Sequence, residues 1–369
     1  MEGPLDWRQA DWRRRFRSAI LRWYRRHARD LPWRRQATPY AVWISEIMLQ
    51  QTQVETVKPY FARFMAEFPN VASLAKADEQ DVLRLWEGLG YYRRARQLHA
   101  AARVVVDQHG GVFPEDSQSV SGLPGIGRYT MGAILSIALD HRQPILEANT
   151  IRLFSRLIGF RGDPTSQEGQ QRLWEFAEQI LPRKHVGQFN QALMEVGSLV
   201  CQVRDPQCAS CPVRARCAAF AGGLQATIPL AKKKRYEEVA EAALVVAKKG
   251  SVLLRQHTGE ERWTGLWDFP RLTLPGPNGE KSQRQQAARL LLSAIPMETG
   301  IGVSTPRWMK QIKYGVTRFR ITLECFAADA VDGRLKRSGA KLRWVKLQEL
   351  DDIPTNTTGR KIARLCQQR

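Results

Sequence analysis

The sequence predicts a multi-domain protein in which an all-α domain precedes a smaller α+β domain. The chain has 369 residues, a length typical of two or three domains. Up to about residue 225 the apolar residues repeat with the period of a helix. After a Gly-, Pro- and Lys-containing segment at 222–238, short β-rich runs replace that pattern. Hydrophobic residues make up 43% of the chain, which is enough for sizeable cores and excludes a disordered protein.

The net charge indicates a polyanionic partner. Lys and Arg number 57 and Asp and Glu 36, so the formal charge is +21. Such an excess attracts nucleic acid or an acidic membrane surface, and we favour nucleic acid. No apolar run approaches the roughly 18–20 residues that span a bilayer, and no secretory signal follows the N-terminus. We therefore expect an intracellular, cytoplasmic protein, in which six cysteines would not form a disulfide framework.

The first domain is predicted to begin with a basic helix. The first 35 residues hold eleven Arg, but acidic residues interrupt them, so we interpret the segment as part of the fold and not as a targeting sequence. Four aromatic residues would anchor it: Trp7, Trp12, Phe16 and Trp23. Helical periodicity continues over 43–64, and a Pro- and Gly-rich turn at 121–128 separates two apolar segments before a helix over 131–139.

The second domain carries weaker signals. The run Lys232–Arg235 is interpreted as a solvated linker in preference to a nuclear address. Residues 242–247 and 251–254 resemble a hairpin around Lys249-Gly250. A helix is expected over 283–294, an alternating strand over 319–326 and another strand over 342–345.

A cluster of cysteines predicts a metal centre. The spacing is C-x6-C-x2-C-x5-C, so four thiolates within 17 residues can converge on one site. The short C-x2-C limb also occurs in zinc sites, but the longer loops favour one [4Fe–4S] cluster with a structural role. The ligands would be Cys201, Cys208, Cys211 and Cys217.

The turn LPGIG at 123–127 is predicted to be a helix-hairpin-helix turn. Its glycines would let backbone amides approach a DNA phosphate, and the next helix would add its dipole. The DNA-contacting residues are then Pro124, Gly125, Ile126, Gly127 and Arg128.

The order of hairpin, acidic residue and cysteine cluster resembles the helix-hairpin-helix DNA glycosylase superfamily. Within it, WISEIMLQQTQV at 43–54 and WEGLGYY at 86–92 closely resemble the MutY-type adenine DNA glycosylases, which excise adenine mispaired with 8-oxoguanine or guanine. The likeness covers nearly the whole chain and is strongest over 20–220. It implies a glycosylase domain at 1–222, a basic linker at 223–238 and a Nudix-like lesion-recognition domain at 239–369.

The resemblance also implies roles for individual residues. Glu46 matches the general acid that protonates adenine at N7, which requires a desolvated site that raises its pKa. Gln51 matches a wedge that enters the base stack when adenine is flipped out. The remaining matches are Leu89 and Tyr91 at neighbouring wedge and pocket positions, Arg34 and Trp33 on the pocket wall, and Glu195 as a supporting carboxylate.

Tyr129 stands where bifunctional relatives place a lysine nucleophile, so no Schiff base can form there and we expect base excision without efficient strand cleavage. The segment PILEAN at 144–149 departs from the family, which has Asp at the position of Glu147 and Gly at Ala148. In the family this carboxylate stabilises the oxocarbenium-like sugar, either as a counter-charge or by transient covalent attack, and helps water add; Glu147 keeps the charge but is one methylene longer. Asn149 would orient this carboxylate or the attacking water.

In the second domain, WTGLWDFP at 263–270 resembles the entry to the family's Nudix-like domain. Residues 279–300 lack the Glu-rich metal box, so nucleotide hydrolysis is not expected. The family's F-S-H lesion-reading loop aligns with residues 316–318. Thr317 would hydrogen-bond the lesion, and Arg318 replaces an imidazole with a permanent cation.

These features predict a monofunctional, monomeric adenine glycosylase of base-excision repair that flips adenine out of double-stranded DNA containing A:8-oxoguanine or A:G mispairs, without membrane partners and associated with the nucleoid. Two alternatives stay open. One is a related mismatch glycosylase with another target, such as thymine opposite guanine. The other is a mispair-binding protein whose catalysis is impaired because Glu147 replaces Asp.

Overall fold

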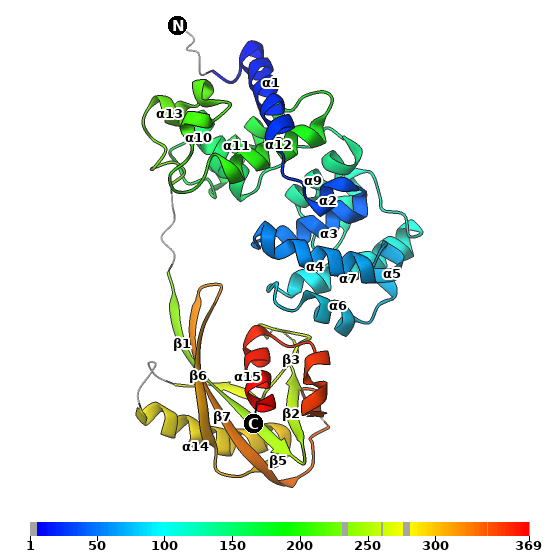
Figure 1. Ribbon diagram of the computed structural model, residues 1–369, viewed down its shortest axis with the longest axis vertical. Coiled ribbons are helices and arrows are strands. Elements are labelled where there is room, and N and C mark those ends of the chain that lie inside the picture. Colours follow the sequence, from blue (N-terminus) through cyan, green and yellow to red (C-terminus); the bar gives the residue numbers. More distant parts are fainter. Residues whose placement is uncertain (1–5, 231–234, 260, 276–280, 338, 369) are drawn as a thin grey trace. The chain divides into compact units, whose positions relative to one another are not determined.

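The computed structural model describes residues 6–230, 235–259, 261–275, 281–337 and 339–368. The chain forms two compact units: the first comprises residues 1–76 and 97–233, and the second comprises 77–96 and 234–369 (Figure 1). Two predicted features lie partly outside the described residues. They are the linker run Lys232–Arg235, of which Arg235 is described, and the segment 279–300 that lacks a Glu-rich metal box, of which 279–280 are not described. No helix in the described ranges combines the length and apolar character needed to cross a membrane.

The first unit is helical, as the sequence predicts. Its buried core joins aromatic residues that lie far apart in the sequence, among them Phe16, Phe154, Phe176 and Phe189. Of the four predicted N-terminal anchors, Trp7, Trp12 and Phe16 are buried, while Trp23 is half-buried and stacks on His27. The helices are α1 (Ala10–His27), α2 (Pro32–Arg35), α3 (Pro39–Leu49), α4 (Val54–Glu67), α5 (Val71–Lys76), α7 (Arg93–His109), α8 (Ser117–Gly122), α9 (Arg128–Leu139), α10 (Ala148–Ile158), α11 (Gln167–Ile180), α12 (Val186–Leu199) and α13 (Ala218–Ala221), with short 3-10 turns at Cys208–Ser210 and Arg214–Arg216.

Helix α3 is buried along almost its whole length, because every residue from Tyr40 to Met48 is buried. The Thr38 side chain caps its N-terminus by accepting a hydrogen bond from the Ala41 amide, and Pro39 occupies the first turn. Burying a charged side chain in such an apolar helix is unfavourable in free energy. Glu46 therefore lies in an environment that disfavours its ionised form.

The predicted hairpin lies between α8 and α9. Gly125 has a φ of +78°, and a Cβ there would approach the Gln97 Cβ to 2.8 Å, so both conformation and space require glycine. Gly127 is the N-cap of α9, and its carbonyl accepts the first helical hydrogen bond from Met131. The turn thus presents backbone and a helix N-terminus without intervening side chains.

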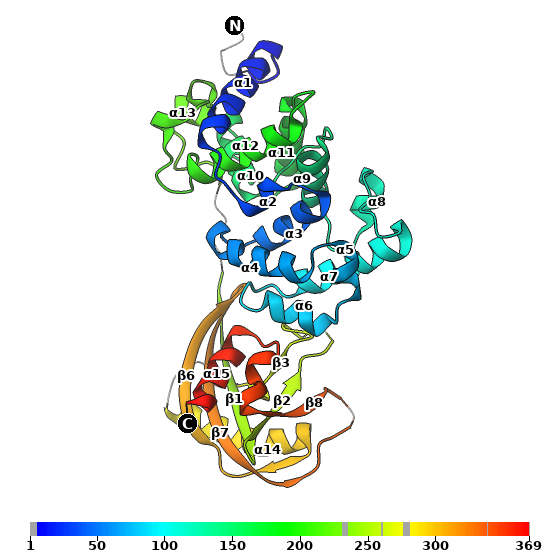
Figure 2. The same cartoon turned by 45° about the vertical axis from the view of Figure 1, so that its right-hand side comes forward.

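The second unit contains an eight-stranded sheet whose main path runs β3-β2-β1-β7-β5, with β4, β6 and β8 paired at β1, β7 and β2. Helix α15 covers one face and α14 the other (Figure 2). The elements are β1 (Glu237–Lys248), β2 (Ser251–Gln256), β3 (Trp267–Asp268), β4 (Arg271–Thr273), α14 (Lys281–Thr299), β5 (Ile301–Val303), β6 (Arg307–Val316), β7 (Phe319–Gly333), β8 (Leu342–Lys346), a 3-10 helix at Leu347–Asp352 and α15 (Thr357–Gln367).

The expected alternation over 319–326 was wrong in one respect. Strand β7 is longer than predicted and is buried on both faces from Ile321 to Ala328. It lies in the middle of the sheet, parallel to β1 and antiparallel to β6, so neither face meets water. Strand β6 itself was not predicted, because its sequence RWMKQIKYGV is rich in charged residues and only Ile312 is buried.

The second unit also includes α6 (Glu79–Trp86) and the turn that follows it, from within the range predicted for the first domain. Glu87 forms a bidentate ion pair with Arg360 of α15, at 2.7 and 2.9 Å. Gln80 accepts a hydrogen bond from the Trp267 indole at 3.0 Å. Polar contacts between residues far apart in the sequence thus attach this segment to the sheet domain.

Candidate active site

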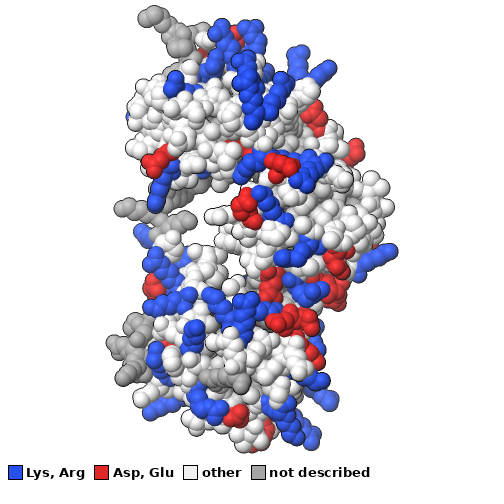
Figure 3. Space-filling view, viewed as in Figure 1, with Lys and Arg blue, Asp and Glu red and all other residues white. Residues whose placement is uncertain are grey.

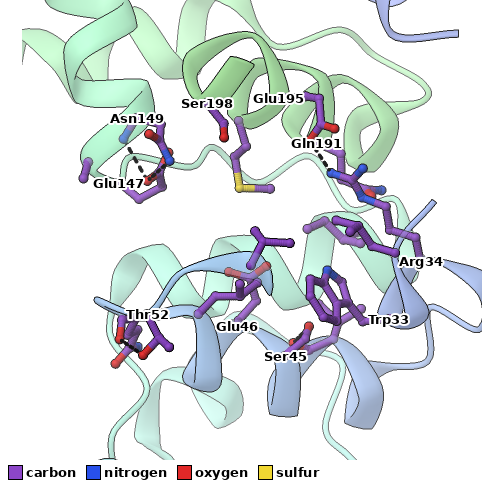
Figure 4. Close-up of a pocket in the computed structure, with 18 of the residues that line it drawn as sticks. Trp33, Arg34, Ser45, Glu46, Thr52, Glu147, Asn149, Gln191, Glu195 and Ser198 are labelled. Atoms are coloured by element: carbon purple, nitrogen blue, oxygen red, sulfur yellow. Dashed lines mark hydrogen bonds and ion pairs between the residues drawn. The ribbon is translucent and has the colours of Figure 1, made fainter. Parts of the chain in front are cut away.

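The first unit contains a cavity of about 580 Å³ lined by residues of α2, α3, α9, α10 and α12. Figure 4 shows how the side chains that line this cavity are arranged. Glu147 and Asn149 lie at one end, Trp33 and Arg34 at the other, and Glu46 between them. The structure therefore brings both predicted catalytic carboxylates to one cavity.

Glu46 is held by Tyr129, whose hydroxyl donates to Glu46 Oε2 at 2.5 Å. The side chain comes from buried α3 and is only 5% exposed. Burial raises the pKa of Glu46 to about 7; the Tyr129 hydrogen bond partly opposes this shift and the charge of Glu147 adds to it. A carboxyl with this pKa can carry a proton at neutral pH and release it to a bound base.

Glu147 folds back onto the helix that it begins. Its Oε2 accepts from the Asn149 amide at 2.8 Å, its Oε1 accepts from the Thr150 amide at 2.9 Å, and Thr150 Oγ1 accepts from the Glu147 amide at 2.7 Å. This capping box places the longer side chain at the N-terminus of α10. Burial nevertheless raises the pKa of Glu147, with the backbone amides opposing the shift.

Asp140, the other acidic residue near this segment, has a structural position. Its carboxylate accepts from the His185 and Gly187 amides at 2.9 and 3.1 Å, at the start of α12. It is not among the described residues that line the cavity.

Asn149 connects Glu147 to a buried arginine. Asn149 Nδ2 lies 3.2 Å from Glu147 Oε2, and its Oδ1 accepts from Arg152 Nη2 at 2.9 Å. Arg152 also donates to the carbonyls of Cys201 and Gly197, at 2.6 and 2.7 Å. The position of Asn149 therefore depends on the backbone that carries the first cysteine of the cluster.

The wall at the other end is built on an ion-pair network. Arg29 Nε and Arg34 Nη2 donate to the two oxygens of Glu195 at 2.7 and 2.9 Å. Burial raises the pKa of Glu195, but the hydrogen bonds from Arg29 and Arg34 outweigh it and bring the pKa to about 2. Glu195 is thus a permanent anion that orients Arg34, while Trp33 packs edge-on against Phe61.

The four predicted cysteine ligands line one further cavity, together with Val213 and Phe220. Arg156 Nη1 donates to Cys201 Sγ at 3.3 Å, as a cation beside a thiolate would. No group of three or more His, Cys, Asp or Glu side chains in the described ranges is arranged to hold a single metal ion. Four cysteine thiols that line one cavity are the donor set that an iron–sulfur cluster takes, and these residues would hold it.

The remaining predicted site residues are the wedge and lesion-reading positions. Gln51 lines the cavity, where it is exposed, with a φ of +57°. Leu89 and Tyr91 belong to the second unit, where Leu89 is buried and Tyr91 is 45% exposed. Thr317 and Arg318 form the turn between β6 and β7; Thr317 has a φ of +51°, a strained value for a β-branched residue, and Arg318 pairs with Glu237 at 2.9 Å.

Sequence reasoning missed Arg29, Arg152, Gln191, Met194 and Ser198, of which all except Arg152 line the cavity. Arg29 is one of eleven arginines in the first 35 residues, so nothing local distinguishes it. The helical spacing of Gln191, Met194 and Ser198 with Glu195 on α12 is a signal that could have identified that face.

Comparisons with known proteins identify the families that the two parts of the chain match. The family model described as HhH-GPD superfamily base excision DNA repair protein matches residues 44–179, and that of the NUDIX domain matches 241–365. A solved structure of a thermostable thymine-DNA glycosylase is 30% identical, with a TM-score of 0.53 over 57% of this chain and 97% of that one. An Endonuclease III–DNA complex, 19% identical with a TM-score of 0.50 over 57% and 96%, shows the same fold.

Fold and site together define a DNA N-glycosylase of base-excision repair, built from a helix-hairpin-helix domain and a Nudix-like domain. The adenine DNA glycosylase of Buchnera aphidicola subsp. Schizaphis graminum is 40% identical over 257 residues, covering 69% of this chain and 74% of that protein. Those of Rattus norvegicus and Homo sapiens are each 32% identical, covering 96% and 95% of this chain and 78% and 74% of theirs. The chain belongs to the MutY-type adenine DNA glycosylase family.

Proposed function

We propose that this glycosylase hydrolyses the N-glycosidic bond of adenine mispaired with 8-oxoguanine or guanine, without cleaving the DNA strand. The observation that carries the proposal is the pairing, in one cavity, of a protonatable Glu46 with the N-capping carboxylate Glu147. The two groups divide the labour as in glycoside hydrolysis, with an acid near the leaving group and an anion near the sugar.

In the proposed reaction, adenine flipped from the stack lies against Trp33 and Arg34. Glu46 transfers its proton to N7, and the bond between N9 and C1′ breaks with its electron pair leaving on the base. The resulting oxocarbenium-like sugar is stabilised by Glu147. Water then adds to C1′ and gives up its proton to a site carboxylate. Because Tyr129 supplies no amine, no Schiff base forms with the sugar, and the DNA strand stays intact.

The test is single-turnover adenine release from an 8-oxoguanine:A duplex by wild type, Glu147→Gln and Glu147→Asp. We expect wild type to be active and the Gln variant to fall by about 10²–10³-fold, because it removes the anion near the sugar. The Asp variant reports the effect of one methylene. If wild type binds the mispair but is inert, and Asp restores release, the protein is a mispair-binding relative.

The monofunctional part has a separate test. Product strands should stay intact until treated with alkali, and borohydride should trap no covalent enzyme–DNA adduct, because no amine occupies the position of Tyr129. A trapped adduct would contradict this part while leaving base removal intact.

Lesion preference is proposed to depend on Thr317 and Arg318 in the β6–β7 turn, where both are close to solvent. Comparing affinities for 8-oxoguanine:A and G:A duplexes with and without Arg318→Ala tests this. An unchanged ratio would rule out a reading role for Arg318.

A second candidate substrate is thymine opposite guanine, favoured by the 30% identity to the thymine-DNA glycosylase. The same assay with a G:T duplex distinguishes the two. The proposal has four further parts. The partner is DNA, and residues 124–128 of the hairpin contact its phosphates. The enzyme is a monomer associated with the nucleoid, and the four cysteines hold a [4Fe–4S] cluster. Iron quantification and sedimentation on the purified protein check the cluster and the monomer.

A further inference from the structure

Four arginines line a second cavity of the first unit, with a volume of about 540 Å³. They come from three places in the sequence: Arg13 and Arg17 from α1, Arg142 from the segment after α9, and Arg183 from the segment after α11. The other lining residues are Ala10, Gln179 and Leu181. Among the described residues no carboxylate lines this cavity, and none is shared with the active-site cavity.

The arginines gather at the C-terminal turn of α11. Arg17 donates to the carbonyls of Ile180 and Gln179 at 2.7 and 2.9 Å, and Arg142 donates to the Glu178 carbonyl at 3.1 Å. A cation at a helix C-terminus is favourable, and Arg17 alone would supply it. The cap does not account for Arg183, whose side chain is exposed and makes no hydrogen bond or ion pair within the described part of the chain.

The guanidinium groups of Arg13 and Arg142 repel that of Arg17. Burial lowers the pKa of Arg17, and the charges of Arg13 and Arg142 lower it further. An anion in the cavity would relieve this repulsion. Guanidinium groups match the oxygens of a phosphate group by paired hydrogen bonds, so phosphate is the anion that suits them.

The cavity is connected to the hairpin through the last turns of α11. Arg128, the final hairpin residue, lies over the Trp174 ring at 3.9 Å and pairs with the Glu178 carboxylate at 2.6 Å. The carbonyl of the same Glu178 accepts from Arg142 of the cavity. Lys and Arg side chains also gather on the surface over α1 (Figure 3).

We propose that the cavity of Arg13, Arg17, Arg142 and Arg183 binds a backbone phosphate of the DNA duplex beyond the hairpin. This inference rests on the proposed DNA substrate and adds a contact site to it. A duplex that extends past the hairpin would place a phosphate there, and the contact would add affinity without reading sequence.

The test is the double variant Arg142→Ser/Arg183→Ser, which leaves the Arg17 cap intact. Its matched control is Arg334→Ser/Arg337→Ser, two exposed arginines of the second unit that do not line the cavity. Binding to a core duplex of about 12 base pairs and to one of about 30 is measured across salt concentrations.

We expect the cavity variant to lose about tenfold in affinity for the long duplex, with a salt slope smaller by about 1, and to lose much less for the core duplex. The control should not change the difference between the two duplexes. Arg142→Lys/Arg183→Lys should fall between wild type and the Ser variant, because it keeps charge but loses the paired hydrogen bonds.

The proposal would be overturned if the cavity variant bound the long duplex with the same affinity and the same salt slope as wild type. It would also be overturned if the control variant lost as much affinity as the cavity variant. A second arm adds tripolyphosphate during thermal unfolding. Stabilisation of wild type but not of the cavity variant, with DNA binding unchanged, would keep the anion site and overturn DNA as its source. Failure of adenine release by wild type would instead refute the proposed function, because these readouts measure affinity alone.

Discussion

The buried carboxylates of this protein fall into two groups. In the Nudix-like domain, burial raises the pKa of Asp268, yet the neighbouring Arg271 and His257 outweigh it, so the pKa lies below its usual value. In the helical unit, Arg29 and Arg34 likewise lower the pKa of Glu195, whereas Glu46 and Glu147 face the cavity and have raised pKa values. The difference lies in whether the neighbouring cations outweigh the effect of burial.

This comparison distinguishes a buried carboxylate that can react with a substrate from one that only stabilises the fold. Asp268 is 1% exposed and enclosed by an ion pair with Arg271 and hydrogen bonds from Asn356 and the Phe269 amide, so it has no room for a ligand. Glu46 is comparably buried, but its protein hydrogen bond comes from a hydroxyl and its cavity is open to a substrate. Burial alone does not mark a functional acid; burial without a compensating charge, beside a cavity, does.

The largest expected effect follows from removing the acid. Glu46→Gln should lower single-turnover adenine release by about 10³-fold or more, because the amide cannot protonate the leaving base. Glu55→Gln, which changes an exposed carboxylate paired with Lys58, is the matched control and should retain the wild-type rate. A rate for the Glu46→Gln enzyme within about tenfold of wild type would contradict the assignment of the general acid.

The charge cluster of the second unit should matter for stability instead. Arg271→Met leaves Asp268 buried without its cation, and we expect it to cost about 3–5 kcal/mol in the free energy of unfolding. Adding Asp268→Leu to Arg271→Met should recover part of that loss, because the Asp268 charge is then gone and Glu241, which also pairs with Arg271, keeps Arg262 as a partner. Denaturant unfolding measures both variants. If the double variant were less stable than the single one, the Asp268 side chain would stabilise the fold by contacts other than its ion pair with Arg271.

The raised pKa of Glu46 predicts a pH dependence of opposite sign to that of Asp268. Adenine release should fall as pH rises through about 7, where the acid loses its proton. Because the folded pKa exceeds the unfolded value of 4.5, stability contributed by the protonated form is present below pH 4.5 and is lost as pH rises to about 7.

Glu46→Gln should remove that dependence. Relative to wild type, the variant should gain up to about 3 kcal/mol in unfolding free energy as the pH rises from about 5 to about 8. This is the free energy that corresponds to the pKa shift of Glu46. Thermal unfolding of both proteins across this range gives the comparison. A constant difference between them would mean that Glu46 is not desolvated in the folded protein.

Much of the first unit follows from local sequence. Helical periodicity predicts the helices around residues 43–64, and the glycines of LPGIG mark the hairpin, where Gly125 has a φ of +78°. These features depend on neighbours within a few turns of chain. For Glu46 the local sequence is equally typical of a surface carboxylate, and the role of this residue is predicted from the family motif alone; its burial on α3 is seen in the structure.

What the sequence could not predict depends on distant partners. Arg29 finds Glu195 across 166 residues, and nothing in the arginine-rich start of the chain distinguishes it from its neighbours. Strand β6 buries only Ile312, so its other apolar residues do not mark a buried face and its assignment comes from pairing with β7. The attachment of residues 77–96 to the second unit depends on Glu87 and Arg360, 273 residues apart.

That last pair gives the smallest expected effect and an intermediate case for the comparison. Arg360 and Glu87 have side chains 13% and 17% exposed, and the bidentate pair raises the pKa of Arg360 through the Glu87 hydrogen bonds. Because both partners keep some solvent, we expect a coupling of about 1–2 kcal/mol in a double-mutant cycle with Arg360→Gln and Glu87→Gln. Unfolding of wild type, both single variants and the double variant measures it. Additive effects would mean that the ion pair does not hold residues 77–96 on the sheet domain, and the charge compensation seen at Asp268 would then not extend to this partly exposed pair.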